Sequence, residues 1–303
     1  MKKTKIAAIV AYILTTAVIL LSGCGNGTTD SNDTVPQSDI SRVAVLFSSL
    51  AEMWTDAGGE IYVTVGEAVE RGFAPEGTPL VDSGAGKTVN LELLISYKPS
   101  LVICSSDIPA QVEAAKLLSE NGIEVLVLRV ESFDDYAAAF KTMTTLTGNS
   151  SAYDKHVLVQ RQMIDSLISE KAGSTKRVLF IRAGSSAAST KAKLSTDHFA
   201  AAMLSELGCE NIAEDAPLLL DGISAEVILT ANVDHIFFST MGNEDAAKAN
   251  IASLLESDAW SSLAAVKNGN VTILPRELFH YKPCSRWSEA YSYLAGVLSE
   301  GQD

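Results

Sequence analysis

The stretch SAYDKHVLVQRQMIDSLISEKA, from Ser151 to Ala172, is the longest uninterrupted helical pattern in the chain. It contains neither Pro nor Gly, a Ser-x-x-Asp cap predicts its start, and Gly173 is suited to its end. Its apolar residues recur at helical spacing, and they are Val157, Ile164, Leu167 and Ile168, with Leu158, Val159 and Met163 widening the stripe. A helix of this length spans roughly 30 Å. It is either a surface helix of one α/β domain or a strut between two lobes.

The N-terminus has the composition of an export signal. Three lysines precede an apolar run from Ile6 to Leu21, which is short for a membrane-spanning helix of about 20 residues. Residues 1–23 are therefore predicted to be a signal peptide. The Leu-Ser-Gly sequence before Cys24 resembles the bacterial lipobox, which implies a lipid-modified Cys24 with diacylglycerol and acyl chains as a membrane anchor. The alternative is a plain signal peptide with an incidental cysteine.

Residues 24–40 are rich in Gly, Ser, Thr, Asn and Asp, which predicts a disordered tether. The other cysteines, Cys104, Cys209 and Cys284, are widely spaced and show no zinc-binding pattern. They are expected to be buried small apolar residues and not a disulfide framework. The formal charge is −14, and removal of the three lysines in residues 1–23 would leave −17. Such acidity argues against nucleic acid as a partner.

The rest of the chain alternates strands with helices, which predicts an α/β fold with parallel-rich sheets flanked by helices. Strands are predicted at 42–47, 62–67, 101–104 and 125–130, and again at 177–182, 235–239 and 271–274. Residues 183–196 are predicted to be a long loop, and 285–298 a closing helix. The predicted organisation is a first lobe over 41–150, a connecting helix over 151–172 and a second lobe over 173–303.

Two segments on either side of the long helix align without a gap. NLELLISYKPSLVICS (residues 90–105) matches SAEVILTANVDHIFFS (residues 224–239). Each has a polar residue, a Glu at the third position, an apolar helical stretch, a turn and an apolar strand ending in Ser. Because helix–strand pairs often resemble one another in α/β proteins, coincidence is the alternative. Together with the long helix, the repeat favours two equivalent lobes.

From Arg42 onward the chain resembles the substrate-binding lipoproteins of bacterial ABC importers for ferric siderophores, haem and cobalamin. The resemblance rests on SSLAEMWTDAGG after the first strand, on the repeated segments, on the long helix and on the stretch WSSLAAVKNGNVTILPRELFHYKPCSRWSEAYSYLAGVL from Trp260. It implies two lobes joined by one long helix, no catalytic residues, no cofactor, and a permease with its ATPase as partners. It also implies a lipid-anchored monomer on the outer side of the cell membrane.

The resemblance assigns a role to the Glu of each repeated segment. Glu92 and Glu226 match the acidic residue that each lobe of such a protein offers to the permease. Taken singly, each is also a favourable residue for the first turn of a helix. Because a strut helix bends little, we expect the lobes to close only slightly on a ligand.

Ligands of parallel α/β lobes bind at the carboxyl ends of the strands. The loops predicted there carry cationic and aromatic side chains, although the chain is acidic, which suits an anionic and partly aromatic ligand such as a ferric siderophore, haem or a corrinoid. The predicted ligand-binding residues are Trp54, Arg182, Lys191, Lys193, His280, Tyr281, Arg286 and Trp287. Arg286 and Trp287 have a structural alternative, because Trp287 shares a helix face with Tyr291 and Leu294.

Other chemistries fit the sequence less well. Tyr281 or His280 could ligate haem iron, but no bare metal site is predicted, because the four histidines are scattered. Residues 83–88 resemble a P-loop but have Val81 where the first glycine is required. The alternative function is an exported lipid-anchored α/β hydrolase, although no Ser-His-Asp order or carboxylate pair is evident.

Overall fold

The computed structural model describes residues 38–82, 88–171 and 175–299 of the chain. The predicted signal peptide, Cys24, almost all of the predicted tether, most of the P-loop-like segment and Gly173 lie outside these ranges. Within them, no helix is both long enough and apolar enough to cross a membrane.

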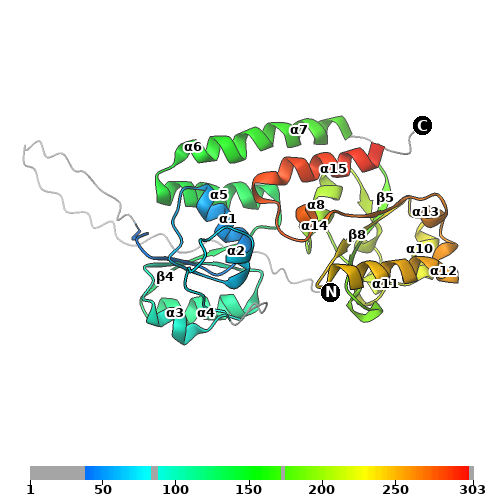
Figure 1. Cartoon of the computed structure of the whole chain (residues 1–303). Helices are drawn as coiled ribbons and strands as arrows, with labels where there is room; N and C mark the ends of the chain where they lie inside the picture. Colours follow the sequence, from blue (N-terminus) through cyan, green and yellow to red (C-terminus); the bar gives the residue numbers. More distant parts are fainter. Residues whose placement is uncertain (1–37, 83–87, 172–174, 300–303) are drawn as a thin grey trace, which may run out of the picture. The chain divides into compact units, whose positions relative to one another are not determined.

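The first lobe is built on a four-stranded parallel sheet with strand order β2-β1-β3-β4. Side chains of β3 alternate between two cores: Leu101 and Ile103 face one, and Val102 and Cys104 the other. Helices α1 and α5 pack on the first face and α3 and α4 on the second (Figure 1). The elements are β1 (Val43–Val45), α1 (Ser48–Asp56), β2 (Val63–Thr64), α2 (Gly66–Glu70), α3 (Leu91–Ser96), β3 (Leu101–Ser105), α4 (Pro109–Glu120), β4 (Glu124–Leu128) and α5 (Phe133–Thr147).

The second lobe contains a sheet of order β6-β5-β8-β9, with β7 paired to β5. All pairs are parallel except β5 with β6, which lies inside the stretch predicted to be a loop. Two residues are too few to show a strand pattern in sequence. The elements are β5 (Arg177–Ala183), β6 (Lys191–Ala192), α8 (Phe199–Glu206), β7 (Glu210–Asn211), α9 (Leu218–Asp221), α10 (Ala225–Ala231), β8 (His235–Thr240), α11 (Glu244–Glu256), α12 (Asp258–Ser261), α13 (Ala264–Lys267), β9 (Val271–Ile273), α14 (Arg276–Phe279) and α15 (Trp287–Ser299).

The long helix is continuous but not uniform. It comprises α6 (Ser150–Tyr153), a π-helical turn (Asp154–Leu158) and α7 (Val159–Lys171). It begins one residue earlier than predicted, because the side chain of Asn149, and not that of Ser151, accepts a hydrogen bond from the amide of Ala152, at 3.3 Å. Helix α15 lies alongside α7 (Figure 1).

The apolar stripe of this helix is narrower than predicted. Val157 and Ile164 are buried, but Leu158, Val159 and Met163 are 46%, 54% and 48% exposed. Val157, Gln160 and Ile164 are buried and Leu167 and Ile168 are half-buried, so only a narrow face of the helix packs on the core. The side chains expected to widen the stripe therefore face solvent.

The repeated segments adopt the same structure. Each forms a short helix (α3 or α10) that leads into a central strand (β3 or β8). Lys98 and Asn232 occupy the same position in the two copies, and both have left-handed backbones, with φ of 49° and 52°. Such values are uncommon for residues other than glycine. The shared geometry supports a structural repeat and not a coincidence of composition.

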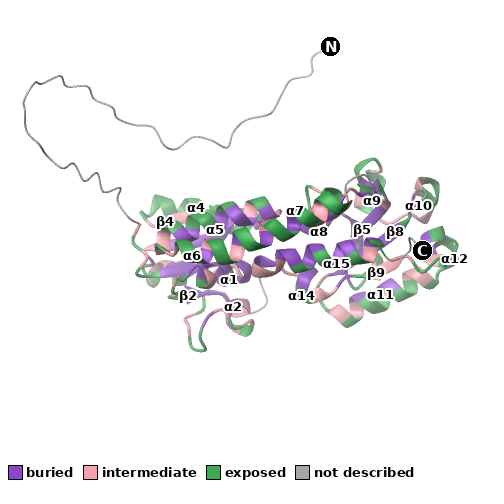
Figure 2. Cartoon of the chain, turned by 90° about the horizontal axis from the view of Figure 1, so that it is seen from above, coloured by how far each residue is buried: buried purple, intermediate pink, exposed green. Residues whose placement is uncertain are grey.

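One core runs through both lobes. It contains Val45 and Ile103 from the first sheet, Phe180 and Phe237 from the second, and Ile164 from the long helix. Figure 2 shows the buried faces of α15 and its neighbours. Residues 38–303 accordingly form one compact unit. The predicted fold class, two α/β lobes with parallel-rich sheets joined by a long helix, is confirmed.

Candidate functional site

Three of the predicted ligand-binding cations lie in a row on the second sheet. Arg182 near the end of β5 is paired directly with Lys191 of β6, and directly paired residues point to the same face of a sheet. Lys193 follows Lys191 by two residues, so it continues on that face. We call Arg182, Lys191 and Lys193 the cation row. The row lies on the same face of the second sheet as Phe180, which belongs to the core that runs through both lobes, called the shared core below.

The cations of this row form no ion pair with any described residue. In the part of the chain that the structure describes, the side chains of Arg182, Lys191 and Lys193 form no hydrogen bond or ion pair. Arg182 is half-buried, and burial lowers the pKa of its guanidinium, an effect that the nearby Glu131 carboxylate partly opposes. An arginine offers five N–H donors in a planar fork, which makes an unpaired one a binding group for anionic oxygens.

His198 marks the centre of this positive region. Its ring is buried between those of Phe180 and Phe199, at 4.7 and 4.6 Å, and its Nδ1 accepts from the amide of Ala200. Burial holds the pKa of His198 well below its usual range, and the charges of Arg182 and other nearby cations lower it further. The imidazole is therefore neutral and packs as an aromatic residue.

Several hydroxyl groups at the strand ends lack partners. Ser239 and Thr240 at the end of β8 are each 2% exposed, and Ser239 is paired in register with Arg182. Buried polar atoms without a hydrogen bond in the described residues include Ser106 Oγ, Ser239 Oγ, Thr240 Oγ1 and Arg276 Nη1. Since a buried unsatisfied group costs about 1–3 kcal/mol, these atoms favour a polar ligand that would satisfy them. Ser106 and Thr240 follow the repeated segments at equivalent positions.

The first lobe presents acidic groups, and Lys282 pairs with two of them. Its ammonium contacts the carboxylate of Glu131, lies 3.8 Å from that of Asp107, and is 5.3 Å from the ring centre of Phe199. Burial raises the pKa of Glu131, and Lys282 opposes that shift. The adjoining cavity measures only about 10 Å³, about the volume that one water needs. Lys282 therefore bridges the lobes at this point.

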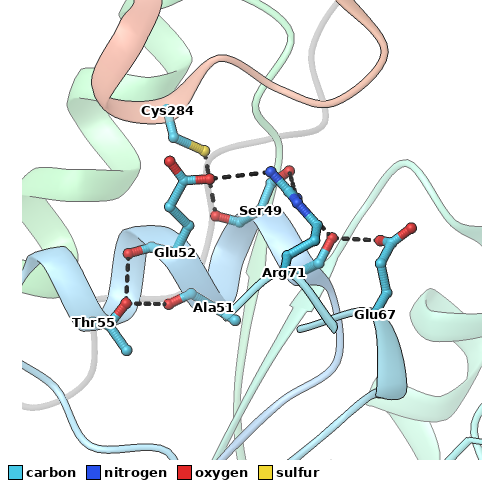
Figure 3. Close-up of polar contacts among 8 residues, drawn as sticks. Ser49, Ala51, Glu52, Thr55, Glu67, Arg71 and Cys284 are labelled. Atoms are coloured by element: carbon cyan, nitrogen blue, oxygen red, sulfur yellow. Dashed lines mark hydrogen bonds and ion pairs between the residues drawn. The ribbon is translucent and has the colours of Figure 1, made fainter. Parts of the chain in front are cut away.

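A second bridge joins α1 to the segment that precedes α15 (Figure 3). The Arg71 guanidinium donates to Ser48 Oγ at 3.0 Å and pairs with Glu52 at 3.3 Å. It also stacks over the ring of Tyr281, 4.0 Å from its centre. Burial raises the pKa of Glu52 to about 7, against the lowering effect of Arg71. The thiol of Cys284 faces the same network and donates to the carbonyl of Ser49.

The other predicted ligand-binding residues lie outside the strands of the cation row. His280 lies beside the site, but both ring nitrogens are engaged, with Thr240 O and with Arg276 Nη2, each at 3.0 Å. Its predicted role as a haem ligand is therefore disfavoured. Tyr281 is half-buried under Arg71 and forms no hydrogen bond through its hydroxyl in the described ranges.

Three predicted contacts are structural. Trp54 and Trp287 are fully buried, each 0% exposed. Trp54 Nε1 donates to the carbonyl of Glu60, and Trp287 packs edge-on against Phe133 and at a tilt against Tyr136. Arg286 forms two 2.7 Å hydrogen bonds with Glu289 on its own helix. Core packing and a local ion pair thus occupy these three side chains, and their contact with a ligand stays a prediction.

Sequence reasoning missed Arg71, His198 and Glu131 as parts of the site. No local pattern distinguishes them, because their roles depend on elements distant in sequence. The cation row was found through its residue types at predicted strand ends. Among the described residues no group of three or more His, Cys, Asp and Glu could hold a metal ion, and the three described cysteines are buried and unpaired.

The acidic residues of the repeat are both accessible. Glu92 is in the first turn of α3 and Glu226 in the first turn of α10, and both are exposed. Neither side chain forms an ion pair with another described residue. They therefore remain free for a partner.

Structures of known proteins share this fold. An ABC transporter substrate-binding protein from Listeria monocytogenes superposes with a TM-score of 0.69 at 16% identity, covering 84% of this chain and 97% of that one. IsdE from Staphylococcus aureus, complexed with heme, superposes with a TM-score of 0.68 at 15% sequence identity. The match covers 86% of this chain and 99% of IsdE. The periplasmic vitamin B12 binding protein BtuF of Vibrio cholerae superposes with a TM-score of 0.64 at 21% sequence identity. The match covers 85% of this chain and 96% of BtuF. These identities establish the fold alone.

Comparison with curated protein sequences finds no match. The family model described as periplasmic binding protein, however, matches residues 43–278, which contain both sheets, the long helix and the cation row. Members of this family bind substrates for transport outside the cytoplasm and are not enzymes, which confirms the prediction of a binding protein. The chain belongs to the periplasmic binding protein family.

Proposed function

We propose that this chain is the extracytoplasmic substrate-binding lipoprotein of an ABC importer and captures a metal-chelate ligand between its lobes, with a ferric siderophore preferred over haem or a corrinoid. The observation that carries the proposal is the cation row, whose side chains form no ion pair with a described residue, beside buried hydroxyls that lack hydrogen-bond partners in the described ranges. Related folds bind heme and vitamin B12, which supports a ligand of this size. The lobes comprise residues 41–150 and 173–303, with the helix of 151–172 between them.

Ligand binding is tested on the purified chain by thermal shift with ferric siderophores, haem and cobalamin. A ligand at a hundredfold excess over its Kd stabilises the folded state by about 2.7 kcal/mol. We expect a clear rise in melting temperature with at least one of these ligands. If no chelate shifts the melting temperature and generic ester or phosphoester substrates are turned over, the proposal fails and the hydrolase alternative gains support.

Membrane attachment through Cys24 is the second part of the proposal. Its support is the Leu-Ser-Gly-Cys sequence at the end of the apolar run, followed by a polar segment. A Cys24→Ala variant should leave the membrane fraction in cell fractionation, because two or more acyl chains are needed for stable anchoring. A variant that remains membrane-bound after detergent-free washing would contradict this anchor.

Delivery to the permease completes the proposal. Glu92 and Glu226 are equivalent in the repeat, exposed and unpaired within the described residues. Two carboxylates, one on each lobe, suit a permease with a basic pocket for each. The permease and its ATPase are the expected partners, and the binding protein is expected to act as a monomer.

A further inference from the structure

The charge of the ligand can be inferred from the ion pairs of the site, on the assumption that the proposed function is correct. The cation row lies on one face of the second sheet, fixed by the register of Arg182 with Lys191 and by the two-residue spacing to Lys193. None of the three has a counter-ion among the described residues. A ligand on this face therefore meets three positive charges that form no ion pair within the described residues, although the carboxylate of Glu131 lies near Arg182.

The acids of the first lobe cancel this charge only in part. Glu131 and Asp107 are paired with Lys282, and Glu52 is paired with Arg71. Glu67 accepts a hydrogen bond from Ser48 and forms no ion pair with any described residue. Lys282 can neutralise only one of its two acids, so with Glu67 two acids of the first lobe stay uncompensated against the three cations of the row. The remaining charge is therefore positive by one, with its cations on the second lobe.

The neutral groups of the site point to anionic oxygens as well. The buried hydroxyl of Ser239, which is paired in register with Arg182, and one nitrogen of Arg276 can donate hydrogen bonds and lack acceptors in the described ranges. Hydrogen bonds from such donors to charged oxygens are about twice as strong as those to neutral ones. Ligand oxygens that carry negative charge would use these donors best.

The histidines do not offer an alternative anchor through iron. His280 has both ring nitrogens engaged, and His198 is 6% exposed and bonded to the amide of Ala200. His235 is bonded to Thr272, and His156 lies 3.9 Å from the Asp56 carboxylate. His280, the histidine beside the site, therefore has no ring nitrogen left for a tetrapyrrole iron, and each of the other three has one ring nitrogen engaged within the protein.

We propose that the ligand is a polyanionic ferric chelate of the tris-catecholate class, whose charged oxygens face Arg182, Lys191 and Lys193. Three doubly charged catecholates around a ferric ion leave a trianionic complex, whereas three hydroxamates leave a neutral one. The two complexes share the metal and the octahedral geometry. A protein that discriminates between the two complexes must therefore recognise their difference in charge. The cation row would do so by attracting the trianionic complex.

The test measures equilibrium binding of the whole mature chain to two synthetic ferric chelates built on the same tripodal backbone, one with catecholate and one with hydroxamate arms. Haem and a corrinoid are measured in parallel. We expect the tris-catecholate to bind at least about tenfold more tightly than the tris-hydroxamate. We also expect this preference to shrink as salt rises from 0.05 to about 0.5 M, because salt screens charges at the site.

A triple variant, Arg182→Gln with Lys191→Gln and Lys193→Gln, isolates the contribution of the row. It should lose most of the preference for the tris-catecholate and bind the tris-hydroxamate about as the parent does. The control is Lys267→Gln, which removes an exposed cation of α13 in the same lobe and should keep the full preference. Circular dichroism melts check that each variant is folded, and the single variant Arg182→Gln replaces the triple one if the latter does not fold.

Tighter or equal binding of the neutral chelate, or a preference unchanged in the triple variant, overturns the inference while the proposed function stands. The same holds if only haem or the corrinoid binds. If none of the four ligands binds, the proposed function fails together with the inference. A catecholate preference that the row variant loses and the Lys267 variant keeps supports both.

Discussion

Glu52 is a half-buried carboxyl group whose environment makes its charge depend on pH near neutrality. Burial raises its pKa from the usual value near 4.5 to about 7, although Arg71 partly stabilises the carboxylate. Because the folded state binds this proton more tightly than the unfolded state, the resulting stabilisation is fully present below pH 4.5. It is lost as the pH rises through about 7.

This gives a prediction for Glu52→Gln. In the parent, the contribution of this group to the free energy of unfolding should fall by on the order of 3 kcal/mol between pH 4.5 and 8. In the variant, that contribution disappears, so the pH dependence over this window should be flatter. Urea denaturation of both proteins at several pH values measures how the free energy of unfolding depends on pH. Parallel curves for parent and variant would show that Glu52 has an ordinary pKa.

At the residue scale, the sequence predicted chemical types better than roles. Arg182, Lys191 and Lys193 were predictable because cations at strand ends of an acidic chain are conspicuous. Trp54 and Trp287 carry the same aromatic signal but are buried in the shared core. Only tertiary packing decides between these outcomes. Arg71 could not be predicted, since its partners Ser48 and Glu52 lie on α1 and Tyr281 lies in a distant segment before α15.

Among the elements, the long helix does more than separate the lobes. The side chain of Gln160 is buried, accepts a hydrogen bond from the amide of Ser288 at 3.0 Å and donates to the carbonyl of Cys284 at 3.4 Å. It thereby satisfies backbone groups at the start of α15, next to the segment that carries Tyr281 and Lys282. The connecting helix thus fixes the position of one wall of the site.

Replacing Gln160 tests this link. Gln160→Leu keeps a side chain of similar size but leaves the amide of Ser288 without this partner, so we expect a loss of about 1–3 kcal/mol in the free energy of unfolding. Urea denaturation measures the change. The matched control is Gln162→Leu, an exposed position on the same helix, which should change stability by less than about 0.5 kcal/mol. Equal effects of the two variants would refute the structural role.

The elements were largely predictable, and their boundaries less so. The alternation of strands and helices, the long helix and the repeat followed from periodicity and spacing. The two-residue strand β6 was not predictable, although it sets Lys191 beside Arg182. The π-turn at Asp154–Leu158 was not predictable either. Both depend on how neighbouring elements pack, which a local pattern does not encode.

For the whole molecule, the repeat predicts two separable surfaces, one for the ligand and one for the permease. Replacing Glu92 and Glu226 together by Ala should abolish uptake in cells and leave ligand affinity within about twofold. Each single variant should reduce uptake partially. Glu256→Ala, an exposed acid of α11, is the control and should leave uptake intact. Weakened ligand binding in the double variant would mean that these residues belong to the ligand site.

The shared core bears on how far the lobes can move. It runs from the first sheet through the long helix and α15 to the second sheet, and Lys282 and Arg71 add contacts across the site. A ligand therefore has to work against a packed interior to move the lobes far. We expect the radius of gyration from small-angle scattering to change by less than about 1 Å on ligand addition. A larger change would indicate a hinge within the long helix.

The central claim is that one ligand contacts the carboxyl ends of strands in both lobes at once. Amide hydrogen exchange with and without a ferric chelate that binds tests it most directly, since each strand end reports separately. The account predicts slower exchange in three places together: residues 105–107 after β3, 182–193 around the cation row and 239–241 after β8. Slowing confined to one lobe, or located on the outer faces around α3 and α10, would contradict it.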